Sequence, residues 1–213
     1  AGQNKIEKFS HDPGDTNSVA SNKLFGERLF ETVDGNLWVP YMGGISVFEP
    51  SRGTFYHFVA EPGKHNSIAK AFWYSVAQDD SNYVYIGTSN GVYRILPAAK
   101  TTSGALHISE RDGLLHNQVY SIVKDKRGML WITCRNGITC YNPAARSCRN
   151  FTYQSGLPQK TLMAPMYHAD DGKIYHGGVE KFFVFSPEAL LNEAEDARVW
   201  FTSFKVYDKE KLP

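Results

Sequence analysis

The chain has 213 residues, of which 42% are hydrophobic and 21% are charged, and its formal net charge is +1. This length and composition are those of a folded globular protein with a buried core, and the near-neutral charge argues against nucleic-acid binding. No apolar run is long enough to span a membrane and no signal peptide is recognisable, so we expect any targeting segment to lie upstream or to have been removed.

The first expected element is a strand at Ile6–Phe9. The polar residues that follow it, at 12–14 and 17–20, recur 49 residues later at 61–63 and 66–69. The same offset relates Phe9 to Phe58, so Ile6–Phe9 corresponds to the last strand of a later unit. We therefore expect the chain to open with the outer strand of a unit whose other strands are not included.

A repeat with spacings of 47, 46 and 44 residues organises the rest of the chain. Its four copies align without gaps when one aromatic residue of each is taken as position 0. These residues are Trp38, Tyr85, Trp131 and Tyr175. The other shared positions are −3 (Gly35, Asn82, Gly128, Gly172), +6 (Gly44, Gly91, Gly137, with Lys181 as the exception), +7 (Ile45, Val92, Ile138, Phe182) and +12 (Pro50, Pro97, Pro143, Pro187).

Repeats of this length with several strands each are typical of a β-propeller built from four-stranded antiparallel blades. The predicted fold is therefore all-β, a partial β-propeller of about four blades. The blades are expected at 24–58, 72–108, 118–153 and 163–185, with an insert at 98–104 and no evident fourth strand in the last blade. In an alternative geometry, Ile6–Phe9 supplies that strand and closes a four-bladed ring.

The segment after the last repeat favours different elements. Residues 188–197 are rich in Glu, Ala and Leu, which favours a helical turn or a charged linker. Val199–Tyr207 has the pattern of a strand.

The third repeat predicts two tight turns. Asp125 and Gly128 frame the first, because Asp bonds nearby backbone groups and Gly adopts a positive φ. The apolar run Leu130–Ile132 indicates a strand covered on both faces. Asn136-Gly137 is typical of a two-residue hairpin turn, which would pair Arg135 with Ile138.

The three cysteines are expected to be small buried hydrophobic residues. In the expected hairpin register, Cys134 and Cys140 point to opposite faces of the sheet, so we expect no disulfide between them. The spacing of these residues and Cys148 does not fit a zinc site.

The sequence Asn117-x-Val119-Tyr120-Ser121-Ile122, followed by Asp125, Gly128, Leu130-Trp131-Ile132 and Gly137-Ile138, resembles the two-component regulator propeller repeat. The resemblance covers residues 6–187. It implies the periplasmic part of an inner-membrane hybrid two-component sensor of the Bacteroidetes type, which recognises glycan fragments and controls carbohydrate-utilisation genes. Residues 1–187 would be propeller blades, and 188–213 would be a linker and the first strand of a triple-tyrosine β-sandwich.

The resemblance also implies the partners of the chain. They are an oligosaccharide or glycan fragment, the remainder of the sensor and a second copy in a homodimer, with the membrane reached only through the parent chain. The histidine kinase activity would lie elsewhere in the parent. Several residues depart from the repeat, among them Thr32, Ala169 and His176.

The sequence offers no recognisable catalytic centre. It lacks a phosphate-binding loop, a zinc-protease motif and a nucleophile elbow, so we expect no enzyme, no catalytic residue, no metal site and no cofactor. The acidic residues between the first and second strands of each repeat are expected to stabilise turns. His168 and His176 lie in neighbouring strands and are expected to form a structural pair.

Candidate ligand-binding residues come from the loops that enter each inner strand and from the hairpins between second and third strands. Aromatic rings beside polar groups at this rim would suit a sugar. The candidates are Arg28, Tyr41, Trp73, Tyr74, His116, Tyr120, Arg135 and His168. The best of them are Trp73, Tyr120 and Arg135, and Trp73→Ala is expected to weaken glycan binding with little loss of stability.

Two other functions fit a propeller. A polysaccharide lyase or glycosidase would need a carboxylate pair or a His/Tyr/metal set at the channel, which the sequence does not locate. A protein-interaction scaffold would use the same rim to bind a partner chain.

Overall fold

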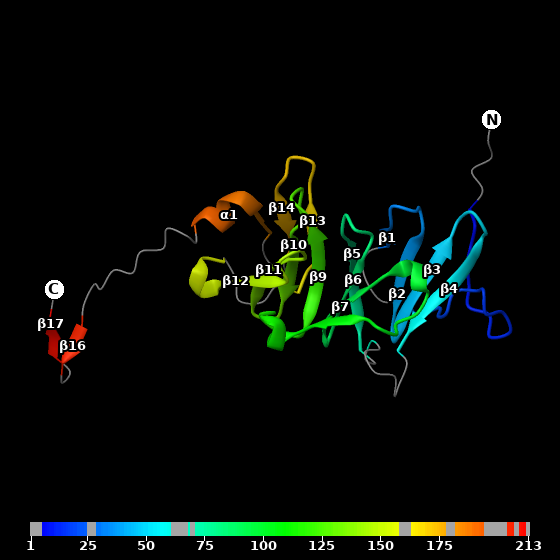
Figure 1. Cartoon of the computed structure of the whole chain (residues 1–213), viewed down its shortest axis with the longest axis horizontal. Coiled ribbons are helices and arrows are strands. Elements are labelled where there is room, and N and C mark those ends of the chain that lie inside the picture. Colours follow the sequence, from blue (N-terminus) through cyan, green and yellow to red (C-terminus); the bar gives the residue numbers. More distant parts are fainter. Residues whose placement is uncertain are drawn as a thin grey trace.

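The computed structural model describes residues 6–24, 29–60, 68, 71–157, 163–177, 182–193, 204–206 and 209–211. Among these residues, the strands form four successive antiparallel sheets and a short hairpin (Figure 1). The prediction of an all-β partial propeller is confirmed. We call the four sheets blades 1 to 4, in chain order.

Within each blade, the strands lie side by side in the order of the sequence. Blade 1 contains β1 (Phe30–Glu31), β2 (Leu37–Tyr41), β3 (Gly44–Glu49) and β4 (Thr54–Val59), and blade 2 contains β5 (Trp73–Gln78), β6 (Val84–Thr88), β7 (Gly91–Ile95) and β8 (Leu106–Ile108). Blade 3 contains β9 (Val119–Lys124), β10 (Leu130–Cys134), β11 (Gly137–Asn142) and β12 (Ser147–Thr152). Blade 4 has three strands, β13 (Met166–His168), β14 (Ile174–His176) and β15 (Phe183–Phe185). Single 3-10 turns lie at Pro97–Ala99, Glu110–Asp112 and Tyr153–Ser155.

The core of the molecule lies between the blades. The first strands of successive blades contact one another, β5 with β9 and β9 with β13 (Figure 1). Three buried apolar clusters fill the spaces between neighbouring sheets. They include Trp38 and Trp73 between blades 1 and 2, Tyr85 and Leu130 between blades 2 and 3, and Trp131 and Ile174 between blades 3 and 4. Packing on both faces explains the continuous apolar run in each second strand.

In blade 3, the turn before β10 holds the aromatic residue at position 0. The indole N–H of Trp131 donates to Oδ2 of Asp125 at 3.0 Å. Oδ1 of the same carboxylate accepts the backbone N–H groups of Arg127 and Met129 at 2.9 and 3.0 Å. Both side chains are buried, so one carboxylate satisfies three donors inside the core. The expected turn role of this acidic residue is confirmed.

Blades 1 and 2 use the same contact with different side chains. The hydroxyl of Tyr85 donates to Asp79 Oδ2 at 3.0 Å. Trp38 Nε1–H donates to Thr32 Oγ1 at 3.2 Å, and this hydroxyl donates to Asp34 Oδ1 at 2.6 Å. The departure at Thr32 therefore preserves the hydrogen bond to the aromatic residue. The turn itself requires a positive φ at position −3, and the values are 79°, 65°, 77° and 82° at Gly35, Asn82, Gly128 and Gly172.

The hairpin of blade 3 corrects the expected register. Cys134 pairs with Gly137, and Thr133 pairs with Ile138, so the two turn residues are Arg135 and Asn136. Gly137 is instead the first residue of β11. A Cβ atom there would lie 2.1 Å from the carbonyl oxygen of Phe151 on β12. Glycine at position +6 thus allows the close approach of two strands, and the turn itself does not depend on it.

The cysteines stay apart despite the shifted register. Cys140 pairs across the sheet with Trp131, three residues before Cys134, so the two thiols lie on opposite faces as expected. All three cysteines are free thiols. Burial raises the pKa of Cys134 and of Cys140 to about 12, which keeps both thiols protonated and unreactive.

The expected strand at Ile6–Phe9 is wrong. These residues are not assigned to any strand of the structure. Phe9 instead packs its ring 4.8 Å from Phe48 and 5.5 Å from Phe55, on blade 1. The described residues therefore do not form the alternative four-bladed ring, because blade 4 has only the three strands β13–β15.

The segment after blade 4 begins with helix α1 (Pro187–Glu193), so the helical alternative is correct over these residues. Strands β16 (Phe204–Val206) and β17 (Lys209–Lys211) form a hairpin. The expected strand at Val199–Tyr207 is present at β16, and residues 199–203 and 207 lie outside the described residues. The division at residue 187 into propeller and β-sandwich stays a prediction.

Candidate functional site

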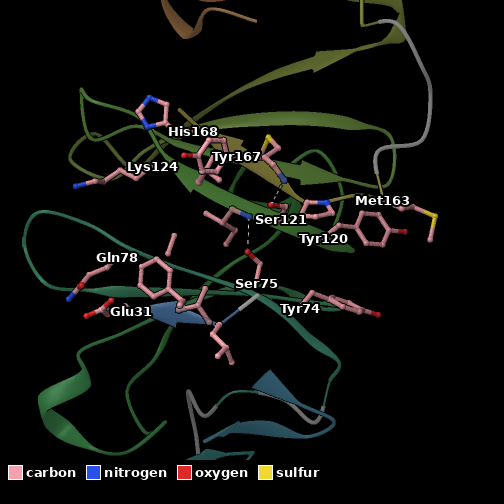
Figure 2. Close-up of a pocket in the computed structure, with 18 of the residues that line it drawn as sticks. Glu31, Tyr74, Ser75, Gln78, Tyr120, Ser121, Lys124, Met163, Tyr167 and His168 are labelled. Atoms are coloured by element: carbon pink, nitrogen blue, oxygen red, sulfur yellow. Dashed lines mark hydrogen bonds between the residues drawn. The ribbon is translucent and has the colours of Figure 1, made fainter. Parts of the chain in front are cut away.

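A cleft of about 730 Å³ lies along the first strands of the four blades. Figure 2 shows its two contrasting sides. Tyr74, Tyr120 and Met163 lie on one side, and Ser75 and Ser121 lie between the sides. The opposite side carries Glu31, Gln78, Lys124 and His168. The cleft therefore has an aromatic end and a polar end.

The repeat explains why these side chains come together. Tyr74 and Tyr120 both occupy position −11, four residues before the polar end. Position −7 is occupied in blades 1 to 4 by Glu31, Gln78, Lys124 and His168. Because the first strands lie side by side, one repeat position supplies a row of side chains across the blades. The cleft thus takes one polar residue from each blade.

Serine side chains hold the inner strands together in the middle of the cleft. Ser75 Oγ accepts the backbone N–H of Ile122 at 2.9 Å, from blade 3 to blade 2. Ser121 Oγ accepts the backbone N–H of Met166 at 2.9 Å, from blade 4 to blade 3. Both serines occupy position −10, and both donors occupy position −9. These bonds fix the spacing of the strands that carry the cleft.

The aromatic end is a row of neighbouring rings. The ring centroids of Tyr74 and Tyr120 are 6.0 Å apart, and Phe72 stacks on Tyr74 at 6.2 Å. Burial raises the pKa of Tyr74, and the neighbouring Tyr120 adds to this shift. Met163 is 62% exposed beside them. Such a surface offers flat apolar faces and phenolic hydroxyls to a ligand.

At the polar end, two side chains at position −7 bind the turn of the preceding blade. Gln78 Oε1 accepts the backbone N–H of Val33 at 2.8 Å. Lys124 forms an ion pair with Asp80. Val33 and Asp80 both occupy position −5 of their blades. These contacts hold the polar end in place.

The structure brings together three of the residues that the sequence singled out. Tyr74, Tyr120 and His168 all line the cleft. Trp73, one of the three best candidates, does not line the cleft, and its burial argues against a direct contact with a ligand there. It is completely buried in the cluster between blades 1 and 2, so Trp73→Ala should cost about 3–5 kcal/mol of stability.

The remaining candidates lie apart from the cleft. Tyr41 is buried on β2, and burial raises its pKa. His116 is half-buried in a loop, where its Nδ1 accepts the N–H of Gln118 at 2.9 Å. Arg135 is exposed in the β10–β11 turn. None of these three lines the cleft, and Arg28 lies outside the described residues.

Sequence reasoning missed three of the four residues at the polar end of the cleft. Glu31, Gln78 and Lys124 were not among the candidates, although their common repeat position was visible in the alignment. Aromatic residues near loops include Tyr74 and Tyr120, which line the cleft, but also Trp73 and Tyr41, which are buried. Residues at the inner edge of each blade could have been found by asking which position is polar in all four repeats.

The two histidines of blade 4 do not form the expected pair. His168 pairs across the sheet with Ile174, and His176 pairs with Met166. The His176 ring is fully buried and stacks on Phe183 at 4.9 Å. Its ring nitrogens have no hydrogen-bond partner among the described residues. Burial lowers the pKa of His176 to about 4, so the ring is neutral at physiological pH.

The described residues 6–24, 29–60, 68, 71–157, 163–177, 182–193, 204–206 and 209–211 show neither a metal site nor a membrane-spanning helix. Over these ranges, no group of three or more His, Cys, Asp or Glu side chains is arranged to hold a metal ion. No helix in the same part of the chain is both long and apolar enough to cross a membrane.

Residues 113–136 match the family model described as two component regulator propeller. This segment runs from the loop before β9 to the β10–β11 turn. The resemblance found in the sequence is thereby confirmed over these residues. No curated protein matches the chain. The matched residues lie in the third of four successive antiparallel sheets, which share the fold of a β-propeller.

Solved structures with the same fold include extracellular domains of two-component systems of B. thetaiotaomicron. One, described as the extracellular domain of a hybrid two component system (BT3049) of B. thetaiotaomicron, is 22% identical, with a TM-score of 0.60 over 80% of this chain and 24% of its own. A second such domain of this organism (BT4673) is 19% identical, with a TM-score of 0.69 over 88% of this chain and 26% of its own. The chain thus spans about a quarter of these structures.

The propeller fold is shared with an enzyme as well. Virginiamycin B lyase from Staphylococcus aureus is 14% identical, with a TM-score of 0.53 over 79% of this chain and 57% of the lyase. At this identity the likeness concerns the fold alone, because one fold hosts many functions. The function must therefore be argued from the cleft.

Proposed function

We propose that this chain is part of the periplasmic ligand-sensing region of a hybrid two-component sensor, and that it binds a glycan fragment in the cleft. The observation that carries the proposal is the contrast between the two ends of the cleft. A sugar ring has an apolar C–H face that stacks on aromatic rings and a rim of hydroxyl groups that needs donors and acceptors. Tyr74 and Tyr120 supply the first, and position −7 supplies the second.

In this proposal the chain passes a signal on and does not convert the glycan. Glycosidases mostly use two carboxylates on either side of the scissile bond. Among the described residues that line the cleft, Glu31 is the only carboxylate. Binding would be transmitted through the remainder of the sensor, in a homodimer, to a histidine kinase that regulates genes for carbohydrate use.

Ligand binding is tested with a panel of oligosaccharides titrated into the protein by isothermal titration calorimetry. Tyr120→Ala should weaken the binding of any ligand found by about tenfold, because a stacked ring contributes about 1 kcal/mol or more beyond its contact area. The matched control is Tyr153→Ala, which removes a 53% exposed ring that does not line the cleft. Equal affinities for both variants, or release of shortened sugars, would contradict the proposal.

The cellular context is tested by fractionating the native organism and detecting the protein with an antibody. A membrane-associated band several times larger than this chain is expected. A soluble band at the mass of the chain alone would contradict a sensor and would direct attention to enzymatic turnover or protein binding.

A further inference from the structure

The side chains at position −7 play two different roles in the cleft. Gln78 and Lys124 each bind the turn of the preceding blade, through Val33 and Asp80 at position −5. Their polar groups are therefore already engaged within the protein. A ligand that used them would have to compete with a contact that joins two blades.

The contact between blades 3 and 4 differs from the two contacts described above. Position −5 of blade 3 is Lys126, and its Nζ donates to the backbone carbonyl oxygen of Asp170 at 2.6 Å. Lys126 therefore does not engage the side chain at position −7 of blade 4, which is His168. Across the described parts of the chain, no residue forms a hydrogen bond with the imidazole ring of His168. Its two nitrogens are left for solvent or a ligand.

The position of His168 also allows it to contact a ligand in the cleft. It lies at the polar end of the cleft and is half-buried (Figure 2). A neutral imidazole donates a hydrogen bond from one nitrogen and accepts one at the other. This combination matches a sugar hydroxyl, which can do both. Partial burial strengthens such a bond, because water competes for it less than at a fully exposed site.

We propose that His168 is the residue that sets the specificity of the cleft, by binding a hydroxyl group of a neutral oligosaccharide whose ring stacks on Tyr120. This inference rests on the proposed function and names the ligand class. The polar groups at the same end carry both signs of charge, Glu31 and Lys124, so a neutral ligand with donors and acceptors fits better than an acidic or basic one.

The dimensions of the cleft define the length of the ligand. Tyr120 and Lys124 lie at the two ends of the cleft and are four residues apart on strand β9. At about 3.3 Å per residue this separation is roughly 13 Å. A single sugar ring is shorter than this distance, so a ligand that contacts both ends is a disaccharide or trisaccharide.

The test uses neutral probes, namely cellobiose, cellotriose, maltotriose, xylotriose and mannotriose, with their monosaccharides for comparison. The tightest binder is titrated into the wild type, His168→Leu and His168→Gln by calorimetry. His168→Leu should weaken binding about five- to tenfold, the effect of one lost hydrogen bond. His168→Gln keeps a donor and an acceptor and should stay within about twofold. The monosaccharide should bind weakly to all three.

The matched control is His107→Leu, the same substitution on outer strand β8, where the ring binds Asn90 and does not line the cleft. It should leave binding unchanged. His168→Leu should melt close to the wild type, because His168 has no described hydrogen bond to lose. A lower melting temperature would assign the residue to packing and overturn the inference.

The remaining outcomes separate the inference from the proposed function. If Tyr120→Ala loses binding and His168→Leu does not, the glycan site stands and the role of His168 is wrong. If neither substitution affects the bound saccharide, or if no saccharide binds, the glycan cleft itself is wrong. If only charged saccharides bind, the site stands and the neutral ligand class is overturned.

Discussion

Blades 3 and 4 share a repeat but differ in how much of it is buried. In blade 3, Trp131 is completely buried in the cluster between blades 3 and 4, and Asp125 is 3% exposed. In blade 4, three strands leave Tyr175 half-buried and Asp171 exposed. In both blades, the aromatic side chain at position 0 donates a hydrogen bond to an acidic residue of the turn. The two blades therefore share the geometry of this hydrogen bond but differ in its burial, which determines how much the bond contributes to stability.

The bond in blade 4 uses a different acidic residue. Position −6 is Ala169, and the hydroxyl of Tyr175 donates to Asp171 Oδ2, at position −4, at 3.2 Å. The backbone N–H of Lys173 lowers the pKa of Asp171, and the carboxylate in turn raises the pKa of Tyr175. A different position thus restores the contact. Water reaches this pair, so we expect it to matter less for stability than the buried pair in blade 3.

The largest expected difference comes from the two aromatic residues. Trp131→Ala should lower the free energy of unfolding by about 3–5 kcal/mol, because it empties a closed site between blades 3 and 4. Tyr175→Ala should change it much less. Urea denaturation followed by circular dichroism measures both. Equal losses would mean that the two blades are equally packed in solution.

The glycine at position +6 is the next test. Gly137→Ala places a methyl group 2.1 Å from the carbonyl oxygen of Phe151, a backbone atom that cannot move aside cheaply. We expect a loss of about 3 kcal/mol, with increased hydrogen exchange in β11 and β12. Gly177→Ala in blade 4 is the control, because its nearest neighbour, the Cβ of Ala164, is 3.6 Å away. A tolerated Gly137→Ala would show that β12 is loosely paired.

Substitutions of Asp125 and Asp171 should also differ in their effect on stability, but by a smaller amount. Asp125→Asn keeps the shape of the side chain but replaces one acceptor by a donor, so at least one of the three N–H groups bound by this carboxylate loses its partner. The expected loss is about 1–3 kcal/mol. Asp171→Asn, at an exposed site, should leave thermal stability unchanged. If Asp125→Asn is as stable as the wild type, water enters the turn and replaces the lost acceptor.

The last test concerns pH. Burial lowers the pKa of His176 from its ordinary value of 6.5 to about 4, so the unfolded chain binds a proton more readily than the folded chain between these values. Stability should therefore be full above pH 6.5 and fall as the pH decreases toward 4. The equivalent residue of blade 3 is Ile132, so His176→Ile keeps the site apolar and should flatten this dependence.

Thermal melts between pH 7 and pH 4 measure the effect as a difference between His176→Ile and the wild type. His107→Leu serves again as the control and should melt in parallel with the wild type. Parallel curves for His176→Ile as well would show that the buried ring titrates normally.

Local sequence determined most of the fold of this protein. The turn at position −3 needs a positive φ, the aromatic residue needs an acceptor in the turn, and the apolar second strand needs cover on both faces. The first two requirements involve residues close in the chain, and the apolar run is itself a local pattern, so the aligned copies predicted the strands of the four blades. The three strands of blade 4 and helix α1 followed from the same local signals.

Only the tertiary structure decided which side chains face the cleft. Trp73 and Tyr74 are neighbours on β5, but Trp73 lies in the core between blades and Tyr74 lines the cleft. Tyr74 is the extra residue of a β-bulge, because Trp73 pairs with Thr88 and Ser75 pairs with Gly87, and a bulge changes the direction of a side chain. Their roles depend on where blades 1 and 3 lie. The His168 ring likewise has no described hydrogen bond because Lys126 binds Asp170 instead. This contact joins residues that are 44 positions apart. Such long-range pairings leave no local signal in the sequence.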